Sequence, residues 1–337
     1  MGFREARNGE YVDKSGLISV INGTLDSKWK FSCVSRARRF GKSMAAEMLY
    51  AYYDRSCDSH ELFDDLEIAS DPTYKVYLNR YPVIYLDLTA FVTRFKKPKL
   101  MDLIDGELKR DIHEAYPDVP LQRGGDLMDY LVRINGRKGD RFIFIIDEWD
   151  TICREFPGGE VMDDYVNWLR RMFKEANASN VFAGVYMTGI LPIKKYQTQS
   201  ALNNFQEYSM VEPRRMARYF GFTKKEVQAL AAKHDMDFDE LEKWYDGYQI
   251  GDEYTIFNPN SVMQALDAGR CRSFWASTGA YDTVSHYIKM NFEGLQDDVI
   301  SMLAGERVAV NTTMFRNDMS EVHSKDDVLT VLIHLGY

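Results

Sequence analysis

Cysteine is scarce in this sequence of 337 residues, which has four, and no two of them form a C-x-x-C pair. Disulfide scaffolds and zinc sites are therefore poorly supported, and the sequence favours a reduced, cytoplasmic protein. Long apolar runs are also missing, since the longest apolar run without tyrosine covers only residues 142–146. A membrane-spanning helix needs roughly 18 such residues. The first residues, MGFREARNGEYVDK, lack the apolar segment of a signal peptide.

An excess of positive charge is absent as well. The chain has 42 Lys and Arg against 51 Asp and Glu, which gives a net charge of −9. This balance excludes binding of nucleic acid over the whole surface, although it allows a local basic face. An apolar content of 45% and a charged content of 28% are typical of a globular chain. The length suggests roughly two domains.

Strands and helices are expected to alternate through residue 212. Apolar segments at residues 28–35, 83–89, 142–148 and 181–189 indicate strands, and the run at 142–146 is apolar on both faces. Helical spacing or composition is found between them, at residues 44–54, 100–115, 126–134 and 161–178. This order predicts an α/β domain over residues 1–212, with a parallel sheet flanked by helices.

Residues 213–337 are predicted to form a second, mostly α-helical domain. Thr223 and Glu226 form a capping box, and Asn258 precedes a proline at a first helical position. Further helices are expected at residues 237–245, 279–292, 295–305 and 324–336, and one short strand at 305–311. The chain ends in an apolar pattern without a polar tail, which suggests a fragment of a longer protein.

The sharpest motif is a phosphate-binding loop that ends in Gly41, Lys42 and Ser43, between an expected strand and an expected helix. Glycine permits close approach of the backbone to phosphate, lysine reaches the β- and γ-phosphates, and the serine hydroxyl binds Mg²⁺. The first glycine of the usual pattern is Arg36 here. Six basic residues and no acidic one lie between residues 28 and 42, which favours polyanion capture over a solvated basic turn. The expected nucleotide-binding residues of this segment are Arg36, Arg38, Arg39, Phe40, Gly41, Lys42, Ser43 and Met44.

A second half of the site is indicated by the apolar strand that ends in Asp147 and Glu148, a Walker B pattern. Asp147 is expected to hold Mg²⁺ together with Ser43, and Glu148 to polarise the attacking water. Thr188, at the end of the next strand, is a candidate for contact with the γ-phosphate or the water, although it can equally satisfy a turn. Asp150 is expected to cap the following helix. Arg214 is the candidate arginine for transition-state charge, with a solvated surface arginine as the alternative.

These motifs resemble those of the bacterial AAA-ATPase-like family, whose members often carry a PD-(D/E)XK nuclease-like domain at the C-terminus. The matching strings are YVDKSGLI (11–18), SRARRFGKS (35–43), IIDEWD (145–150), TGILPI (188–193), RYFGFTKKEV (218–227), KWYDGYQIG (243–251), FNPNSV (257–262) and FWASTG (274–279). The family typically has R-x-R-R-F-G-K-S in this loop, so Arg36 follows its pattern. Ala37 replaces a usual proline.

The resemblance implies an ASCE-type P-loop NTPase core followed by a helical region that can be winged-helix-like. It also implies that Tyr11 and Asp13 lie near the adenine. A nuclease-like domain would follow residue 337, and no nuclease motif is found within the chain itself.

The leading hypothesis is therefore Mg²⁺-dependent ATP binding with slow or regulated hydrolysis that controls the attached helical or nuclease-like module. The alternative is a nucleotide-gated module that binds DNA or a protein with little turnover. A phosphotransferase is disfavoured because no acceptor-binding lid is evident, and a GTPase because no N-K-x-D motif is present. Expected partners are ATP and a DNA or protein bound through the C-terminal domain or the nuclease-like domain. No membrane partner is expected, and the sequence leaves open whether the chain forms a homo-oligomer.

Overall fold

The computed structural model divides the chain into two compact units. The first comprises Met1–Val34, Lys42–Gly189 and Lys195–Glu207, and the second comprises Ser35–Gly41, Ile190–Lys194 and Tyr208–Tyr337. The last change of unit, at Tyr208, lies close to the predicted domain boundary at residue 213. The structure describes residues 2–94, 99–156, 158–193, 202–245, 247–250, 254–274, 289, 292–312, 315 and 322–337.

A five-stranded sheet runs through the first unit. Its strands are β1 (Phe31–Ser35), β2 (Val83–Asp87), β3 (Phe142–Asp147), β4 (Phe182–Gly189) and β5 (Gln206–Tyr208), in the order β2-β3-β4-β1-β5. β2 pairs with β3, and β3 with β4, in parallel. β4 therefore separates the strand that precedes the phosphate loop from the strand that ends in Asp147, as in the ASCE-type core. The expected α/β fold is confirmed.

The central strand β3 is buried along its whole length. A strand that is covered on both faces must be apolar at every position, and Phe142–Asp147 satisfies this until its final carboxylate. The rings of Phe144, Phe173 and Phe182 pack against one another beside it, with centroids 5.5–6.0 Å apart.

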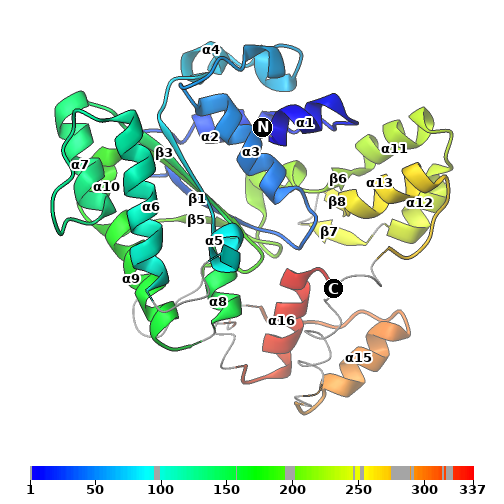
Figure 1. The fold of residues 1–337 in the computed structure, drawn as a ribbon. Helices are drawn as coiled ribbons and strands as arrows, with labels where there is room; N and C mark the ends of the chain where they lie inside the picture. The colour runs from blue at the N-terminus through cyan, green and yellow to red at the C-terminus, as the bar shows by residue number, and fades with distance from the viewer. Residues whose placement is uncertain are drawn as a thin grey trace. The chain divides into compact units, whose positions relative to one another are not determined.

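Helices cover both faces of the sheet. Helix α3 packs against β2, β3 and β4, and Figure 1 shows α1 and α3 on one side, with α6, α7, α9 and α10 on the other. Helix α6 has the predicted bounds. The helices of this unit are α1 (Gly2–Asn8), α2 (Gly16–Asn22), α3 (Lys42–Tyr53), α4 (Tyr74–Tyr77), α5 (Leu88–Arg94), α6 (Leu100–Ala115), α7 (Leu127–Lys138), α8 (Thr151–Glu155), α9 (Glu160–Lys174) and α10 (Ala178–Val181), with 3₁₀ turns at His60–Leu62 and Glu67–Ser70.

The second unit contains a small antiparallel sheet that the sequence analysis did not predict. Its strands β6 (Phe222–Thr223), β7 (Tyr248–Ile250) and β8 (Tyr254–Phe257) lie in the order β6-β8-β7. The two helices α11 (Lys224–Lys233) and α12 (Phe238–Tyr245) lie between β6 and β7 in the chain, and a short turn joins them. One strand, two helices and a closing hairpin follow one another here, which is also the chain order of a winged helix, and the winged-helix-like fold itself stays a prediction.

The predicted helix signals in this unit are confirmed. Thr223 and Glu226 form the reciprocal capping box of α11, and the Asn258 side chain caps α13 (Pro259–Ala268). A 3₁₀ helix, η3 (Arg214–Tyr219), precedes β6.

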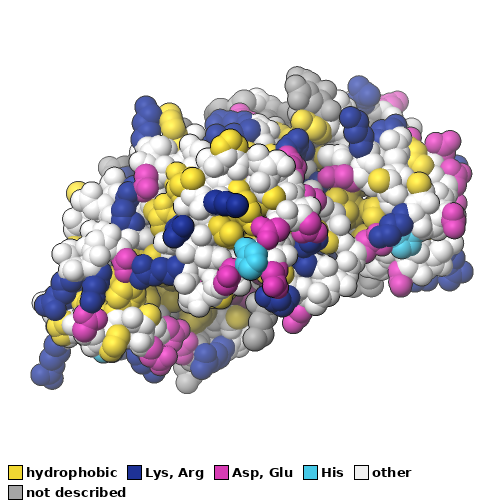
Figure 2. Space-filling view, turned by 90° about the horizontal axis from the view of Figure 1, so that it is seen from above, with side chains coloured by type: hydrophobic (Ala, Val, Ile, Leu, Met, Phe, Trp, Pro, Cys, Tyr) yellow, Lys and Arg dark blue, Asp and Glu magenta, His cyan; other side chains and the backbone are white. Residues whose placement is uncertain are grey.

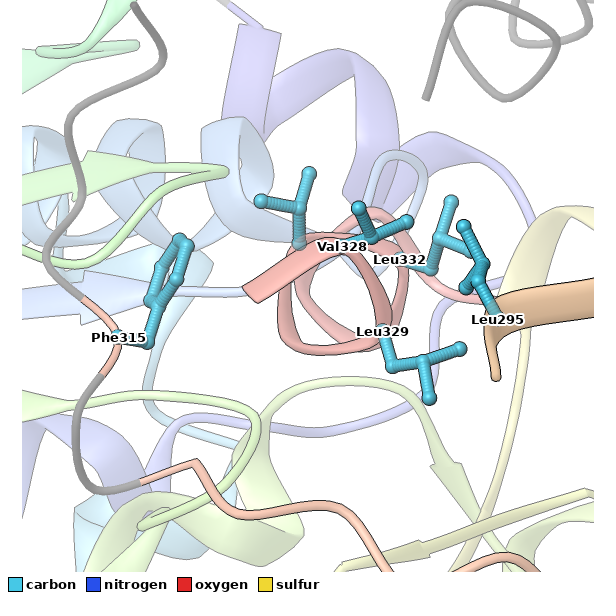
Figure 3. Close-up of a cluster of buried hydrophobic side chains, with 6 residues drawn as sticks. Leu295, Phe315, Val328, Leu329 and Leu332 are labelled. Carbon is cyan, nitrogen blue, oxygen red and sulfur yellow. The ribbon is translucent and has the colours of Figure 1, made fainter. Parts of the chain in front are cut away.

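Two further helices, α15 (Leu295–Leu303) and α16 (Lys325–Leu335), form another core. Figure 3 shows Leu295 beside side chains of α16, with Phe315 completing the buried cluster. The strand expected at residues 305–311 is wrong, because residues 306–312 are neither strand nor helix. Of the helix expected at 279–292, only residues 289 and 292 lie among the described residues.

The surface carries charges of both signs. On the face in Figure 2, Lys and Arg side chains are interspersed with Asp and Glu rather than gathered into one stripe. None of the helices among the described residues has the length and apolar character needed to cross a membrane.

Candidate functional site

The candidate site lies at the carboxyl ends of three neighbouring strands of the first unit. Asp87 and Asp147 are paired residues at the ends of β2 and β3, and Thr188 precedes the last residue of β4. Carboxyl ends of parallel strands meet at one edge of the sheet, so residues about 100 positions apart in the chain converge there. The Thr188 Oγ1 donates a hydrogen bond to Asp147 Oδ1 at 3.2 Å. The structure thus brings together Thr188 and the acidic strand end.

Asp147 is buried, with 4% of its surface exposed. Burial raises the pKa of its carboxyl, and the nearby carboxylates of Glu148 and Asp87 raise this pKa further. A hydrogen bond from Ser43 and the charge of Lys42 act in the opposite direction. The environment of Asp147 therefore holds negative charge that is only partly compensated, which suits a divalent cation.

Lys42 and Ser43 open helix α3, where free backbone N–H groups and the helix dipole favour an anion. Gly41 precedes them with a φ of +84°, and a Cβ at this position would meet nothing within 4 Å. The glycine is therefore required by backbone conformation and not by space. The Lys42 side chain is 4% exposed and its Nζ lies 3.4 Å from Glu148 Oε1.

Glu148 follows β3 with a φ of +52°, which is unfavourable for a side chain of this kind. Such strain persists only where surrounding contacts hold it, and it is often found at functional sites. Its backbone N–H donates to Asp147 Oδ1 at 3.0 Å, and the next amide, that of Trp149, donates to the Thr188 carbonyl at 2.8 Å. These bonds fix the turn that aims Glu148 at the Lys42 end of α3.

Arg154 on α8 belongs to the site and was missed by the sequence analysis. Its NH2 group donates to Glu148 Oε2 at 2.8 Å, and its Nε donates to Asp150 Oδ2 at 3.1 Å. Asp150 does occupy the N-cap position of α8, but its side chain makes no capping hydrogen bond. The spacing of four residues between Asp150 and Arg154 was the available signal, and the capping interpretation obscured it.

The phosphate loop Ser35–Gly41 packs within the second unit. Arg36 is fully buried there, and its NH1 donates to the carbonyl oxygens of Ser35 at 2.8 Å and Tyr208 at 2.9 Å. Its guanidinium also lies over the Phe220 ring, 5.4 Å from the centroid. The structure therefore places Arg36 as an internal brace of the loop.

Phe40 anchors the other end of this loop. Its carbonyl accepts a hydrogen bond from Gly221, and its ring meets that of Tyr248 edge-on at 5.0 Å. Ala37 and Phe40 share a buried cluster with Met210, Ala217 and Ile256. Both ends of the loop are thus held by the C-terminal part of the chain.

The other predicted residues occupy varied positions. Arg38, Arg39 and Met44 are exposed. The Asp13 carboxylate accepts hydrogen bonds from the backbone N–H groups of Ser15 and Glu67, both at 2.7 Å.

Tyr11 and Arg214 lie in different units of the chain. The Tyr11 hydroxyl lies 3.6 Å from Met48 Sδ, and burial raises its pKa. Arg214 belongs to the second unit, where it is 56% exposed and pairs with Glu212 at 3.1 Å.

The residues at the strand ends fit a Mg²⁺–nucleotide. No group of three or more His, Cys, Asp or Glu side chains among the described residues is arranged to hold a metal alone. Mg²⁺ usually retains water and takes phosphate ligands beside one or two protein groups, which Ser43 and Asp147 would provide. Lys42 supplies a positive charge for the phosphates, and Glu148 supplies a carboxylate that can accept a proton from water.

Comparisons with known proteins place the chain in a family. Residues 2–198 match the model of the AAA-ATPase-like family, described as predicted AAA-ATPases. An uncharacterized protein in the vnfD 5′ region of Azotobacter chroococcum mcd 1 is 25% identical over 290 residues. That match covers 82% of this chain and 52% of the relative, so the chain spans about half the length of the curated relative it matches.

Among solved structures, the chain is similar to the crystal structure of Cdc6p from Pyrobaculum aerophilum, with a TM-score of 0.37 and 11% identity. The alignment covers 95% of this chain and 91% of that one. The family match covers more than half of the chain and coincides with the sheet and the loop described above. The chain belongs to the AAA-ATPase-like family, and residues 2–198, which the family model matches, contain a P-loop nucleotide-binding domain.

Proposed function

We propose that this chain binds ATP together with Mg²⁺ and hydrolyses it slowly, and that the nucleotide state acts on the C-terminal unit. The observation that carries the proposal is the meeting of Lys42, at the start of α3, with Glu148, at the end of β3, at 3.4 Å. A buried lysine at a helix N-terminus that faces an acidic pair is the arrangement that phosphoryl transfer to water requires.

Each residue has a defined task in this proposal. Lys42 leaves Glu148 and binds the β- and γ-phosphates. Ser43 and Asp147 would hold Mg²⁺, which would supply charge neutralisation at the phosphates. Glu148 orients the attacking water and accepts its proton, while Thr188 keeps Asp147 in place through its hydrogen bond.

Slow turnover would follow from the source of the arginine that stabilises the transition state. A positive charge placed on the transition state contributes about 10³–10⁵ in rate. Arg214 of the second unit, or an arginine of a neighbouring copy in a homo-oligomer, would provide it. We propose that the isolated chain is a weak ATPase until such an arginine engages.

Control of the C-terminal unit would follow from the phosphate loop. The loop packs with that unit, while Lys42, the next residue along the chain, belongs to the first unit. A shift of the loop backbone on phosphate binding would therefore act directly on Ala37 and Phe40 in the buried cluster of the second unit.

A nucleotide-gated interaction module with little turnover is the second candidate, and the winged-helix order of β6 to β8 favours it. In a DNA-binding winged helix, α12 would be the helix that enters the major groove. This helix carries three acidic residues and one basic residue, namely Asp239, Glu240, Glu242 and Lys243. Phosphates repel such a face, so a protein partner fits the C-terminal unit better than DNA does.

Thermal melting with and without Mg²⁺-ATP tests nucleotide binding, with Mg²⁺-GTP in parallel. A ligand at about 100 times its Kd stabilises the folded state by roughly 2.7 kcal/mol, a rise in Tm of a few degrees. We expect the rise with ATP, its loss in Lys42→Ala and its retention in Lys75→Ala, an exposed lysine of the same unit. A rise that survives in Lys42→Ala would refute the assignment of the site.

Phosphate release by wild type and Glu148→Gln separates the two candidates. If the chain hydrolyses ATP, wild type should release phosphate at a measurable rate. Glu148→Gln should release much less phosphate while it still binds ATP. Equal, near-zero release by both proteins, together with ATP-dependent melting, would favour the interaction module.

A further inference from the structure

The Glu148 carboxylate contacts two cationic side chains, those of Lys42 and Arg154, at different distances. Lys42 Nζ lies 3.4 Å from one carboxylate oxygen, while Arg154 donates to the other at 2.8 Å. The shorter contact is a charge-assisted hydrogen bond of ordinary strength, and the longer one is a looser ion pair.

Arg154 is anchored on its other side. Its Nε donates to Asp150, whose side chain is fully buried, and its NH2 also donates to Thr151 Oγ1 at 3.2 Å. Separating a buried carboxylate from its cation is strongly unfavourable, because the charge is left without compensation in a region shielded from water. Arg154 therefore stays with Asp150 whatever happens at the nucleotide site.

In the proposed function, Lys42 moves to the phosphates when nucleotide binds. When it moves there, Glu148 loses the weaker of its two cations and keeps the stronger one. The backbone of Glu148, at φ +52°, is in a conformation that is unfavourable for this residue and that surrounding contacts must hold.

We infer that Arg154 is the positioning residue for Glu148, a fixed guanidinium that keeps the carboxylate aimed at the attacking water after Lys42 has moved to the phosphates. Arg154 acts through Glu148 and not on the phosphates, since Glu148 and Asp150 already engage its guanidinium. The inference rests on the proposed hydrolysis and adds to it the residue that sets the geometry of the base.

Arg154→Ala is the direct test, measured as kcat for ATP hydrolysis and, separately, as ATP affinity. Misplacing a catalytic group by about 1 Å costs on the order of 100-fold in rate. We expect kcat to fall by about this factor while the Kd for Mg²⁺-ATP changes by less than about twofold. Arg154→Lys should recover part of the rate because an ammonium can hold one of the two carboxylates, and guanidinium ion at millimolar concentration should partly rescue Arg154→Ala.

Two further variants keep the test decisive. Arg154→Ala leaves the buried carboxylate of Asp150 without its arginine, and this variant can therefore unfold. The double variant Asp150→Asn/Arg154→Ala removes both charges and should preserve the fold in that case. Arg137→Ala, at an exposed arginine of α7, is the matched control and should match wild type.

The outcomes separate the inference from the function on which it rests. Full kcat in Arg154→Ala or in the double variant overturns the inference. Loss of ATP binding in the double variant to the extent seen in Lys42→Ala overturns it as well, because Arg154 would then be a phosphate ligand. Unchanged hydrolysis in Glu148→Gln would instead refute the proposed role of Glu148 and, with it, the reason for a positioning residue.

Discussion

Gly189→Ala is expected to destabilise the first unit and to lower ATP turnover together. Gly189 ends β4 beside the turn after β3, and an ideal Cβ there would lie 2.6 Å from Asp150 Oδ1 and 2.6 Å from Trp149 Cδ1. Ordinary carbon contacts are about 3.5–4.0 Å. Asp150 is fully buried and Trp149 is 6% exposed, so neither side chain can withdraw into solvent.

The magnitude follows from that overlap. Overpacking of a buried site costs typically about 1–3 kcal/mol, which corresponds to a fall in Tm of roughly 2–12 °C for a domain of this size. Turnover should fall too, because displacement of Asp150 moves Arg154 and so Glu148. Differential scanning calorimetry and phosphate release measure the two effects.

Gly136→Ala provides the matched control. Gly136 lies in helix α7, where a Cβ would meet nothing within 4 Å. Alanine in an exposed helix is more stable than glycine by about 0.5–1 kcal/mol, so this variant should melt slightly higher than wild type. A Gly189→Ala protein that melts within about 1 °C of wild type and keeps its activity would refute the packing argument.

Thr223→Ala removes the capping box of α11 and should cost about 1 kcal/mol, seen as a lower urea midpoint with an unchanged m value. Gly221→Ala should cost more than Gly269→Ala, because both have positive φ but only the first would overlap a neighbour, the Ile256 side chain; equal melting of the two variants would contradict this. Asp147→Asn should be more stable than wild type at pH 7 without Mg²⁺, because burial raises the pKa of Asp147 and the stability of such a protein falls as pH rises through that value. Mg²⁺ binding by wild type should weaken as pH falls, and this weakening should begin above the usual pKa range of a carboxyl group. If this reasoning is wrong, calorimetric titration with Mg²⁺ would show no difference between wild type and Asp147→Asn.

The sheet and the acidic strand end were predictable from the sequence because their signals are local. A run of apolar residues that ends in Asp147 and Glu148 can be read without knowledge of its neighbours. The start of α3 at Lys42 is equally local, since Gly41 and the following helical composition mark it. Convergence of these segments then follows from the parallel order of the strands alone.

The environment of Arg36 could not be predicted in this way. Its sequence neighbours are basic, which indicates a solvated or phosphate-binding loop, yet Arg36 is buried against the carbonyl of Tyr208. That partner lies 172 positions along the chain, and no periodicity in the sequence reports so distant a contact.

The small sheet of the second unit escaped prediction for a different reason. β6 has two residues, β7 three and β8 four, which is too short for an alternating pattern to stand out. Conversely, the Val-Ala-Val pattern near residue 309 has the composition of a strand, but its residues are not in a ladder.

The packing of Ala37 and Phe40 with Met210, Ala217 and Ile256 has a consequence for synthesis on the ribosome. Synthesis adds about 5–20 residues per second, so the partners of the loop emerge roughly 10–40 seconds after the loop itself. During that interval the nascent chain can pair β1, β2, β3 and β4 while the loop still lacks the side chains that hold its shape. Capture of nucleotide by a nascent chain should therefore begin late, after residue 256 has left the exit tunnel.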